Sequence, residues 1–443
     1  MSRQEGSKVK PGRKTATPRR AAARPKPAAI PLPAAGAVGA RISRRAADRI
    51  RAGHVWVYAS DIENLKLPAG SSTALVPVAD QRGLLLGTAL YSPTSQIALR
   101  LISREEVNEA AWLDLFENRL AAAIERRLPL LSDETDSCRL CFSEADELPG
   151  LIADKYGDLV ILQLLARGLD TEAIRKRAVS AVRSKLKPRM ILERPDAHIR
   201  ELENLSLPET APLWKARGGK AAEASTEFHL NGLAFHFDAN SGQKTGAFLD
   251  QRENYRAAAE WAQRLGQTGR ALDVCCYQGG FALHLGRVCQ QVTGLDQSHV
   301  SLEVAEQNLE ANRDKLSATV DWVEGDAFEA LRGWSEAGER YQTIVLDPPA
   351  FAKSQRAVEG ALRGYKELNL RALKMLTPGG LLVTCSCSHH VSLAELEATV
   401  ASAAADAHRR VRLIERRGAS QDHPVLLNLP ETEYLKCLIL EAL

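Results

Sequence analysis

An aspartate and a cysteine follow two apolar runs in the last third of the sequence, where each could take part in chemistry. Asp347 opens the loop Asp347-Pro348-Pro349-Ala350-Phe351 after the run 343–346, and Cys387 stands shortly after the run 381–384. If the runs are parallel strands of one sheet, their carboxyl ends share an edge, so the carboxylate and the thiol face one crevice. The prolines fix the loop backbone, and a thiolate is a strong nucleophile. The pair therefore predicts covalent chemistry on a substrate that the loop holds.

Methylation of cytosine at C5 is the reaction that most needs such a thiol. C5 is a poor nucleophile, but addition of the Cys387 thiolate to C6 makes C5 enamine-like, so that it can attack a methyl sulfonium. Loss of the C5 proton and elimination then release the enzyme. A lone cysteine is more often a small buried hydrophobe, and its place beside Asp347 is what favours the catalytic interpretation. Pro348, Pro349 and Phe351 are then expected to hold the base, with Phe351 able to stack on it.

The residues upstream of this pair predict a nucleoside cofactor. The run 271–274 leads into a Gly279-Gly280 turn and a helix, and glycines let a backbone approach a bound nucleoside closely. Asp296 ends the next strand-like run, where a carboxylate suits a ribose diol, and Asp326 follows the third, where it could accept from an adenine amino group. Each acid alone would be a helix cap or a loop residue, but acids after successive strands favour the nucleoside. The candidate cofactor residues are Tyr277, Gly279, Gly280, Phe281, Asp296, Asp326 and Asp347.

The pattern of elements predicts three domains that position these residues. Across residues 227–443, strands alternate with helices at the pace of a doubly wound α/β domain. Residues 41–108 hold a short helix and closely spaced strand-like runs, which predict a small β-barrel. Residues 109–220 mix helices with strands and predict an α+β central domain, and residues 215–225 have the composition of a linker.

A basic tail precedes the domains. Residues 1–40 contain nine Lys or Arg and one Glu, so the remaining residues hold 49 of the 58 basic side chains and 54 of the 55 acidic ones. The folded body is therefore slightly acidic, and any affinity for RNA must come from local patches or from the tail. The tail contains too few apolar residues to fold alone, so we expect disorder. It could bind phosphates, or it could be a solubilising extension.

The cysteine spacing and the lengths of the apolar runs indicate where in the cell the protein is located. The eight cysteines lack the spacing of a disulfide framework, which favours reduced thiols and the cytoplasm. The apolar runs are too short to span a membrane, so no membrane partner is expected. Cys138 and Cys141 have the spacing of a zinc half-site but no second pair, and the adjacent His389 and His390 point in different directions. We therefore expect no metal site.

These motifs together resemble the bacterial cytosine-C5 methyltransferases of large-subunit (23S) ribosomal RNA that carry an N-terminal PUA domain. The resemblance covers nearly everything after residue 40. The matching motifs are Lys244-Thr245-Gly246 through Leu249-Asp250-Gln251-Arg252, Tyr277-Gln278-Gly279-Gly280-Phe281, Asp347-Pro348-Pro349-Ala350-Phe351, Arg363-Gly364-Tyr365-Lys366, Ser386-Cys387 and Asp422-His423-Pro424.

The resemblance implies a fold, a cofactor and further site residues. It implies a PUA-like RNA-binding domain at 41–108 and a Rossmann-like class I methyltransferase domain at 227–443, with S-adenosylmethionine (SAM) as cofactor. Cys387 is then the attacking thiol, and Asp347 positions the cytosine. Many RNA cytosine-C5 enzymes use a second cysteine for release, and Ala350 in its place is consistent with a single-cysteine family. The segment implied to close over the cofactor contributes Lys244, Thr245, Asp250, Gln251 and Arg252.

Several alternatives stay open at this point. Cys385, two residues before Cys387, leaves the choice of thiol ambiguous. Arg363, Tyr365 and Lys366 could bind RNA, or they could cap and solvate a helix. Methylation of a guanine or adenine nitrogen, and a non-catalytic RNA-binding role in ribosome assembly, are competing functions. A nicotinamide oxidoreductase is disfavoured because the glycine turn lacks the dinucleotide spacing. The expected partner is ribosomal RNA, naked or in an assembling subunit, and the oligomeric state is open, a homodimer included.

Overall fold

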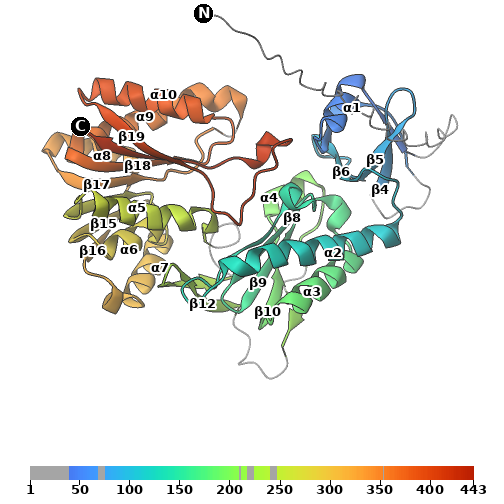
Figure 1. The fold of residues 1–443 in the computed structure, drawn as a ribbon, viewed down its shortest axis with the longest axis horizontal. Coiled ribbons are helices and arrows are strands. Elements are labelled where there is room, and N and C mark those ends of the chain that lie inside the picture. The colour runs from blue at the N-terminus through green and yellow to red at the C-terminus, as the bar shows by residue number, and fades with distance from the viewer. Residues whose placement is uncertain (1–38, 68–74, 209–210, 217–223, 240–246, 353) are drawn as a thin grey trace, which may run out of the picture.

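Three units make up the described part of the chain (Figure 1), and some of their hydrophobic clusters span two units. The computed structural model describes residues 39–67, 75–208, 211–216, 224–239, 247–352 and 354–443. Almost all of the tail predicted at 1–40 lies outside these residues, and so do Lys244 and Thr245. In the described ranges, no helix is both long and apolar enough to cross a lipid bilayer.

The N-terminal unit is a six-stranded sheet with one helix. Strand β1 pairs parallel with β4, and every other pairing is antiparallel, in the order β2-β6-β5-β4-β1-β3. Strands β1 and β3 are absent from the sequence-based prediction, and β1 begins within the segment assigned to the tail. The elements are β1 (Gly39–Ile42), α1 (Arg44–Arg51), β2 (Trp56–Tyr58), β3 (Ile62–Lys66), β4 (Leu75–Ala79), β5 (Leu85–Tyr91) and β6 (Ile97–Ser103).

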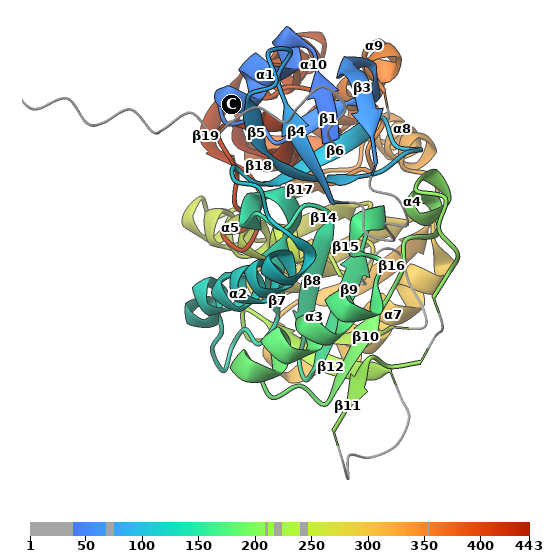
Figure 2. The same cartoon turned by 90° about the vertical axis from the view of Figure 1, so that its right-hand side faces the viewer.

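The central unit is a five-stranded sheet whose order is β11-β10-β9-β8-β7. Helices α2 and α3 pack on each other and cover one face of this sheet (Figure 2). Cys138 and Cys141 lie in β7 with buried side chains, and burial raises the pKa of Cys138 to about 12. The elements are α2 (Glu109–Arg127), β7 (Cys138–Phe142), β8 (Leu151–Tyr156), β9 (Leu159–Leu164), α3 (Glu172–Lys185), β10 (Met190–Glu193), α4 (Ala197–Leu202) and β11 (Trp214–Lys215).

The C-terminal unit is a seven-stranded sheet in the order β16-β15-β14-β17-β18-β20-β19, with only β20 antiparallel to its neighbours. Helices α5 and α6 lie on one face and α9 and α10 on the other (Figure 1), which confirms the predicted doubly wound α/β domain. The strands are β14 (Arg270–Val274), β15 (Gln291–Asp296), β16 (Thr319–Glu324), β17 (Tyr341–Leu346), β18 (Leu376–Ser386), β19 (Val411–Arg417) and β20 (Lys436–Ala442). The helices are α5 (Arg252–Arg264), α6 (Gly280–Gly286), α7 (His299–Glu310), α8 (Ala327–Ala337), α9 (Val358–Met375) and α10 (Leu393–Asp406).

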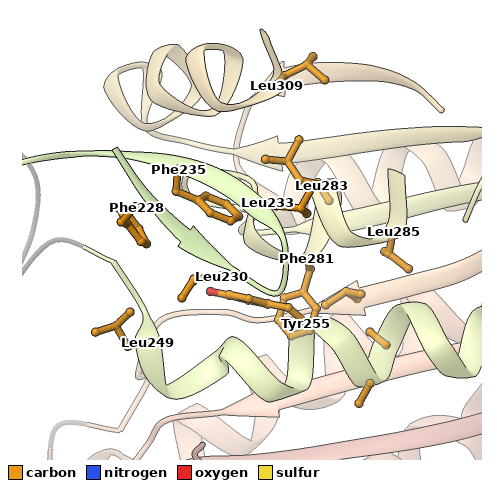
Figure 3. Close-up of a cluster of buried hydrophobic side chains, with 14 of the residues drawn as sticks. Phe228, Leu230, Leu233, Phe235, Leu249, Tyr255, Phe281, Leu283, Leu285 and Leu309 are labelled. Carbon is orange, nitrogen blue, oxygen red and sulfur yellow. The ribbon is translucent and has the colours of Figure 1, made fainter. Parts of the chain in front are cut away.

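A hairpin joins the central unit to the C-terminal unit. Its strands are β12 (Ser225–Leu230) and β13 (Leu233–Asp238). Phe237 stacks on Tyr156 of the central sheet with 4.2 Å between ring centroids. Phe228 and Phe235 continue this core toward α5 and α6, where the ring of Tyr255 meets the ring of Phe281 edge to face at 4.7 Å (Figure 3). Apolar burial thus makes the two units one packed body.

A buried ion cluster around Asp422 ties the same two units together. The side chain of Asp422 is fully buried, its Oδ2 accepts from the backbone N–H of Arg139 at 2.8 Å, and both carboxylate oxygens lie 3.5 Å from the guanidinium of Arg252. Burial opposes ionisation, but the adjacent His423 ring, Arg252 and the Arg139 amide outweigh it and lower the pKa of Asp422 to about 2. Arg127 of α2 also donates to the Asp422 carbonyl at 3.2 Å.

The N-terminal unit contacts both of the other units. The indole N–H of Trp56 donates to Glu144 of the central unit at 2.9 Å. The imidazole of His54 lies 3.8 Å from Glu431, which belongs to the connection between β19 and β20. Short 3₁₀ helices occupy Ala59–Asp61, Leu128–Leu130, Ser143–Asp146, Arg167–Leu169, Leu249–Gln251, Arg313–Lys315, Gln355–Ala357 and Pro430–Thr432.

We expect Asp422→Asn to lower the free energy of unfolding by about 3 kcal/mol, because it removes the fully buried carboxylate beside the Arg252 guanidinium, whose other acidic neighbour, Glu253 at 3.6 Å, is partly exposed. Urea denaturation followed by circular dichroism measures the change. The matched control is Glu359→Ala, which breaks an ion pair with Arg363 whose side chains are 71% and 86% exposed. That control should change the free energy of unfolding by less than about 1 kcal/mol.

The same variant should alter the acid dependence of stability. The pKa of Asp422 lies at about 2 in the folded protein against an ordinary 3.8, so its contribution is nearly complete above about pH 5 and is lost as the pH falls toward 2. Over this interval the wild type should lose about 2 kcal/mol more stability than Asp422→Asn, because the other carboxylates titrate in both proteins. Parallel stability curves for the two proteins over this interval would contradict the assignment.

Candidate functional site

A cavity of about 390 Å³ opens at the carboxyl ends of β14, β15, β16, β17 and β18. It lies where the strand order reverses between β14 and β17, the usual position of a ligand site in an open α/β sheet. The sequence-predicted residues that line it are Asp250, Gln251, Tyr277, Gly280, Phe281, Asp296, Asp326, Asp347, Pro348, Pro349, Phe351 and Cys387. The structure therefore brings together most of the predicted cofactor residues and the predicted catalytic pair.

The turn after β14 forms the floor of the cavity and cannot hold larger residues at its glycines. Gly279 has φ +83°, and a Cβ on it would lie 2.8 Å from the ring of Trp322. A Cβ on Gly280 would lie 2.4 Å from the ring of Tyr255. Tyr277 also has a left-handed backbone, φ 51°, and its N–H donates to Asp296 at 2.9 Å. The glycines thus keep the backbone of this turn at the cavity, where it can approach a bound nucleoside closely, as the sequence predicts.

The two acids assigned to the nucleoside also hold the backbone of the cavity wall. Asp296 accepts from the backbone N–H of Ser298 at 2.9 Å as well as from Tyr277. Asp326 is the N-cap of α8, and its Oδ1 accepts from the N–H groups of Phe328 and Glu329 at 2.9 and 3.0 Å. The carboxylate of Asp326 therefore caps a helix and also lines the cavity.

The segment before α5 supplies a second wall. The amide of Gln251 donates to Asp347 Oδ2 at 3.0 Å, and Gln251 Oε1 accepts from Asn254 at 2.6 Å. Asp250 Oδ2 accepts from the hydroxyl of Tyr434 at 2.5 Å. The other oxygen, Asp250 Oδ1, is buried and has no hydrogen-bond partner among the described residues. Tyr434 is absent from the sequence-based prediction, because it lies beyond the last recognisable motif and no local pattern marks it.

The structure separates the two candidate thiols. Cys387 lines the cavity, with its Sγ 3.9 Å from the carbonyl oxygen of Pro348. Cys385 is fully buried opposite Cys437 in the antiparallel pair β18–β20. The hydrogen bond with Cys437 and burial raise the pKa of Cys385 well above its usual value. Only Cys387 of the two is therefore placed to meet a ligand in this cavity.

A chain of buried hydroxyls holds the strand end that carries Cys387. The hydroxyl of Tyr365 lies 2.9 Å from both Ser386 Oγ and Ser388 Oγ, and the N–H of Ala352 donates to Ser388 Oγ at 3.1 Å. Tyr365 is only 1% exposed. The prediction that Tyr365 contacts RNA is therefore wrong, because its ring is enclosed and its hydroxyl links the thiol strand to the Asp-Pro loop.

Arg252 also differs from its predicted role. Its side chain is buried in the Asp422 cluster and does not line the cavity that holds Cys387. Assignment of Arg252 to the cofactor is therefore corrected to a structural ion pair.

The remaining predicted residues lie at the surface or rim. Arg363 and Lys366 lie on α9 outside the cavity and form ion pairs with Glu359 and Asp406. Gly364 between them has a role in packing, since a Cβ there would lie 3.3 Å from the ring of Phe351.

The adjacent histidines after the thiol strand do not form a metal centre in the structure. Their ring centroids are 5.7 Å apart, and burial, the neighbouring His390 and Lys436 lower the pKa of His389. Within the described ranges, no group of three or more His, Cys, Asp or Glu side chains is arranged to hold a metal ion.

The residues of the cavity fit SAM. Asp296, Asp326 and Asp347 line the cavity, and their carboxylates suit a ligand that carries positive charge and hydroxyl donors. Asp250 Oδ1, which is buried and has no partner in the described part of the chain, offers an acceptor for a further donor of the ligand. The aromatic rings of Phe248 and Phe328 add apolar walls for a nucleoside.

Two protein families match the chain. The PUA-like domain family matches residues 40–104, and a family described as S-adenosylmethionine-dependent methyltransferase matches residues 198–426. The curated ribosomal RNA large subunit methyltransferase I of Erwinia tasmaniensis is 35% identical over 385 residues, which is 86% of this chain and 94% of the relative. The protein of the same name from Pseudoalteromonas translucida is 37% identical over 388 residues, 87% of this chain and 94% of the relative.

Solved structures share the whole architecture. A candidate SAM-dependent methyltransferase from Streptococcus mutans matches with a TM-score of 0.75 at 20% identity, over 91% of this chain and 100% of its own. A methyltransferase complexed with SAH matches with a TM-score of 0.76 at 20% identity, with the same coverage. These likenesses and the family matches confirm the predicted fold class, a PUA-like domain followed by a Rossmann-like methyltransferase domain.

We expect Tyr365→Phe to lower the free energy of unfolding by about 1–3 kcal/mol, because it removes the common partner of two buried serine hydroxyls. SAM affinity, measured by calorimetry, should change less than about twofold, since Tyr365 does not line the cavity. The control is Lys366→Ala on the solvent side of the same helix, which should cost less than about 1 kcal/mol. A large loss of SAM affinity with unchanged stability would contradict this role.

Proposed function

Because the chain belongs to the S-adenosylmethionine-dependent methyltransferase family, and is 35% identical to a ribosomal RNA large subunit methyltransferase I over 86% of its length, we propose that it methylates C5 of a cytosine in large-subunit ribosomal RNA. The observation that carries the C5 assignment is Cys387, whose Sγ lies 3.9 Å from the Pro348 carbonyl in the same cavity as Asp347. Methylation of a nitrogen needs no thiol in this position.

The chain's own residues perform the covalent steps of the proposed reaction. SAM, when bound, supplies the methyl group that is carried on its sulfonium. Cys387 Sγ forms a bond to C6 of the cytosine, and the electron pair of the C5–C6 double bond becomes available at C5. C5 takes up the methyl group, a base then removes the C5 proton, and the electrons of that bond expel the Cys387 thiolate. Each step leaves atoms and charge balanced.

The loop around Asp347 orients the base for this attack. Asp347 is itself held by Gln251 at 3.0 Å, so its carboxylate has a fixed direction. The ring of Phe351 packs against Tyr365 with 4.8 Å between centroids, which fixes it at the cavity wall. In the proposal, Asp347 and the carbonyls beside Pro348 hydrogen-bond the edge of the cytosine, and Phe351 borders its face.

The substrate has to present its cytosine outside a helical stack. C5 and C6 are covered inside a duplex, so the target is single-stranded, looped or flipped. In the proposal, the PUA-like domain and the central unit hold the flanking RNA, which is naked or part of an assembling subunit in the cytoplasm. Exposed cations such as Arg363 on α9 are candidates for backbone contacts.

We expect Cys387→Ala to abolish methylation and Cys385→Ala to spare it, because only Cys387 lines the cavity. A deletion strain complemented with each variant provides the test, with 5-methylcytosine in large-subunit RNA measured by nucleoside mass spectrometry. One 5-methylcytosine should be missing with Cys387→Ala and present with Cys385→Ala. Full methylation by Cys387→Ala, or a missing methylated purine in its place, would indicate nitrogen methylation instead.

RNA containing 5-fluorocytosine should trap the covalent intermediate. Fluorine at C5 replaces the proton that has to leave, so elimination cannot follow methyl transfer and the Cys387–C6 bond persists. With SAM present, wild type and Cys385→Ala should give a protein–RNA band that survives denaturing electrophoresis, and Cys387→Ala should give none. A wild type that binds SAM but forms no such band would overturn the covalent mechanism.

A further inference from the structure

Lys436 is a nearly buried lysine beside the proposed nucleophile, and no step of the proposed reaction uses it. It begins β20 and stands opposite Ser386, the residue before Cys387, in the β18–β20 register. Lys436 is only 6% exposed, and its Nζ donates to the carbonyl oxygens of Ser388 at 2.8 Å and Tyr434 at 2.7 Å. The amine is therefore held by the residue that follows the thiol and by the segment that leads into β20.

The ammonium of Lys436 lacks an ordinary counter-ion. Buried lysines in folded proteins are normally paired with an anion. Among the described residues, no Asp or Glu oxygen forms an ion pair with Lys436 within 4.0 Å. Glu395 instead caps α10, where its carboxylate accepts from Ser392 at 2.7 Å, and Glu433 is exposed. Burial lowers the pKa of Lys436, and Cys387 opposes that shift more strongly than Glu433 or Glu395 does.

The thiol has a matching need for a cation. A free cysteine has a pKa near 8.5, so only a small fraction is thiolate at neutral pH. In the wall of the same cavity, burial and the carboxylates of Asp296 and Asp347 raise the pKa of Cys275. A nucleophilic thiolate here therefore requires a positive charge placed beside it.

We propose that the buried ammonium of Lys436 holds Cys387 as a thiolate, which makes Lys436 a positioning residue for attack on C6. The role in catalysis rests on the proposed function, whereas the ion pair is a property of the free enzyme. On ionisation the thiol proton passes to water, and Lys436 keeps its own proton. When Sγ bonds to C6, the sulfur lone pair enters the new bond and the negative charge passes to the base.

Among the described residues, Lys436 is the buried cation whose charge acts on Cys387. Burial, His390 and Lys436 itself lower the pKa of His389, so its ring is uncharged at neutral pH. The acidic groups that face Lys436 are Glu395 on α10 and Glu433 in the loop before β20. Glu431, in the same loop, faces His389. Tyr434 offers only its backbone carbonyl to Lys436, because its hydroxyl is bound to Asp250.

The pH dependence of Cys387 alkylation in the full-length protein tests the pair without RNA. Purified wild type, Lys436→Met, Lys436→Gln and Lys436→Arg are treated with iodoacetamide from pH 5 to pH 10, and the Cys387 peptide is quantified by mass spectrometry. The wild-type midpoint should lie below 8.5. Both neutral variants should raise it by about one pH unit, which is about tenfold slower alkylation at pH 6.5, and Lys436→Arg should restore most of the wild-type rate.

Cys275 is the internal control because it lines the same cavity, but burial and nearby aspartates, not Lys436, shift its pKa. Its alkylation should stay slow and unchanged in all variants. A variant whose Cys275 reacts as fast as its Cys387 has lost its fold. In that case the proposal is judged from the alkylation midpoints of wild type and Lys436→Arg, which should both lie below 8.5. A wild-type midpoint at or above 8.5, or a folded neutral variant with an unchanged midpoint, overturns the proposal.

The same proteins separate this inference from the proposed function. If the low midpoint depends on Lys436 but no 5-methylcytosine depends on the protein, the ion pair stands and the proposed function fails. If cytosine is methylated and the midpoint is independent of Lys436, the proposed function stands and the ion pair fails. In methylation assays, the acidic limb of the rate profile should also move to higher pH in Lys436→Gln and not in Lys436→Arg.

Discussion

The parallel pairing of β17 with β18 is the constraint on which the rest of the site depends. Its register sets Leu346 opposite Thr384, so the Asp347 loop and the Cys387 strand end leave the sheet at one edge. Cysteines and serines alternate from 385 to 388, and side chains alternate across a strand. The thiols therefore face the α5 side and the serines face Tyr365 on the α9 side. A slip of one residue would exchange them and remove Cys387 from the cavity.

Polar contacts on both faces of the sheet hold this edge in place. On one face, Gln251 links Asp347 to Asn254 of α5. On the other, the hydroxyl of Tyr365 bridges the two serines that flank Cys387, at 2.9 Å each. Buried polar networks of this kind are costly when any member is unsatisfied, so they specify one arrangement. The loop and the thiol thus have fixed positions before any ligand is bound, which is what attack along one direction requires.

Local patterns predicted the parts of the site that depend on one strand and the turn after it. Cys387, Asp347 and the glycine turn are of this kind, because each follows an apolar strand at a recognisable spacing. The roles of Arg252 and Tyr365 were not predictable, because both stand in the matching motifs and only tertiary burial shows that neither lines the cavity. Strand β7 was missed for a related reason: its charged Arg139 pairs with Asp154 inside the sheet and interrupts the apolar pattern.

The connection from β19 to β20 was the least predictable part, and it links the outer units to the chemistry. Ser420 in it binds the backbone of Asp250, and Asp422 binds the central unit. Glu431 then reaches His54 of the N-terminal unit before the chain enters the cavity wall at Tyr434. This one connection therefore contacts all three units and ends in the wall of the cavity that holds Cys387. For the proposed substrate, RNA held by the outer units therefore meets the thiol in a fixed geometry, so the selection of the target cytosine depends on the shape of the flanking RNA as well as on the base in the cavity.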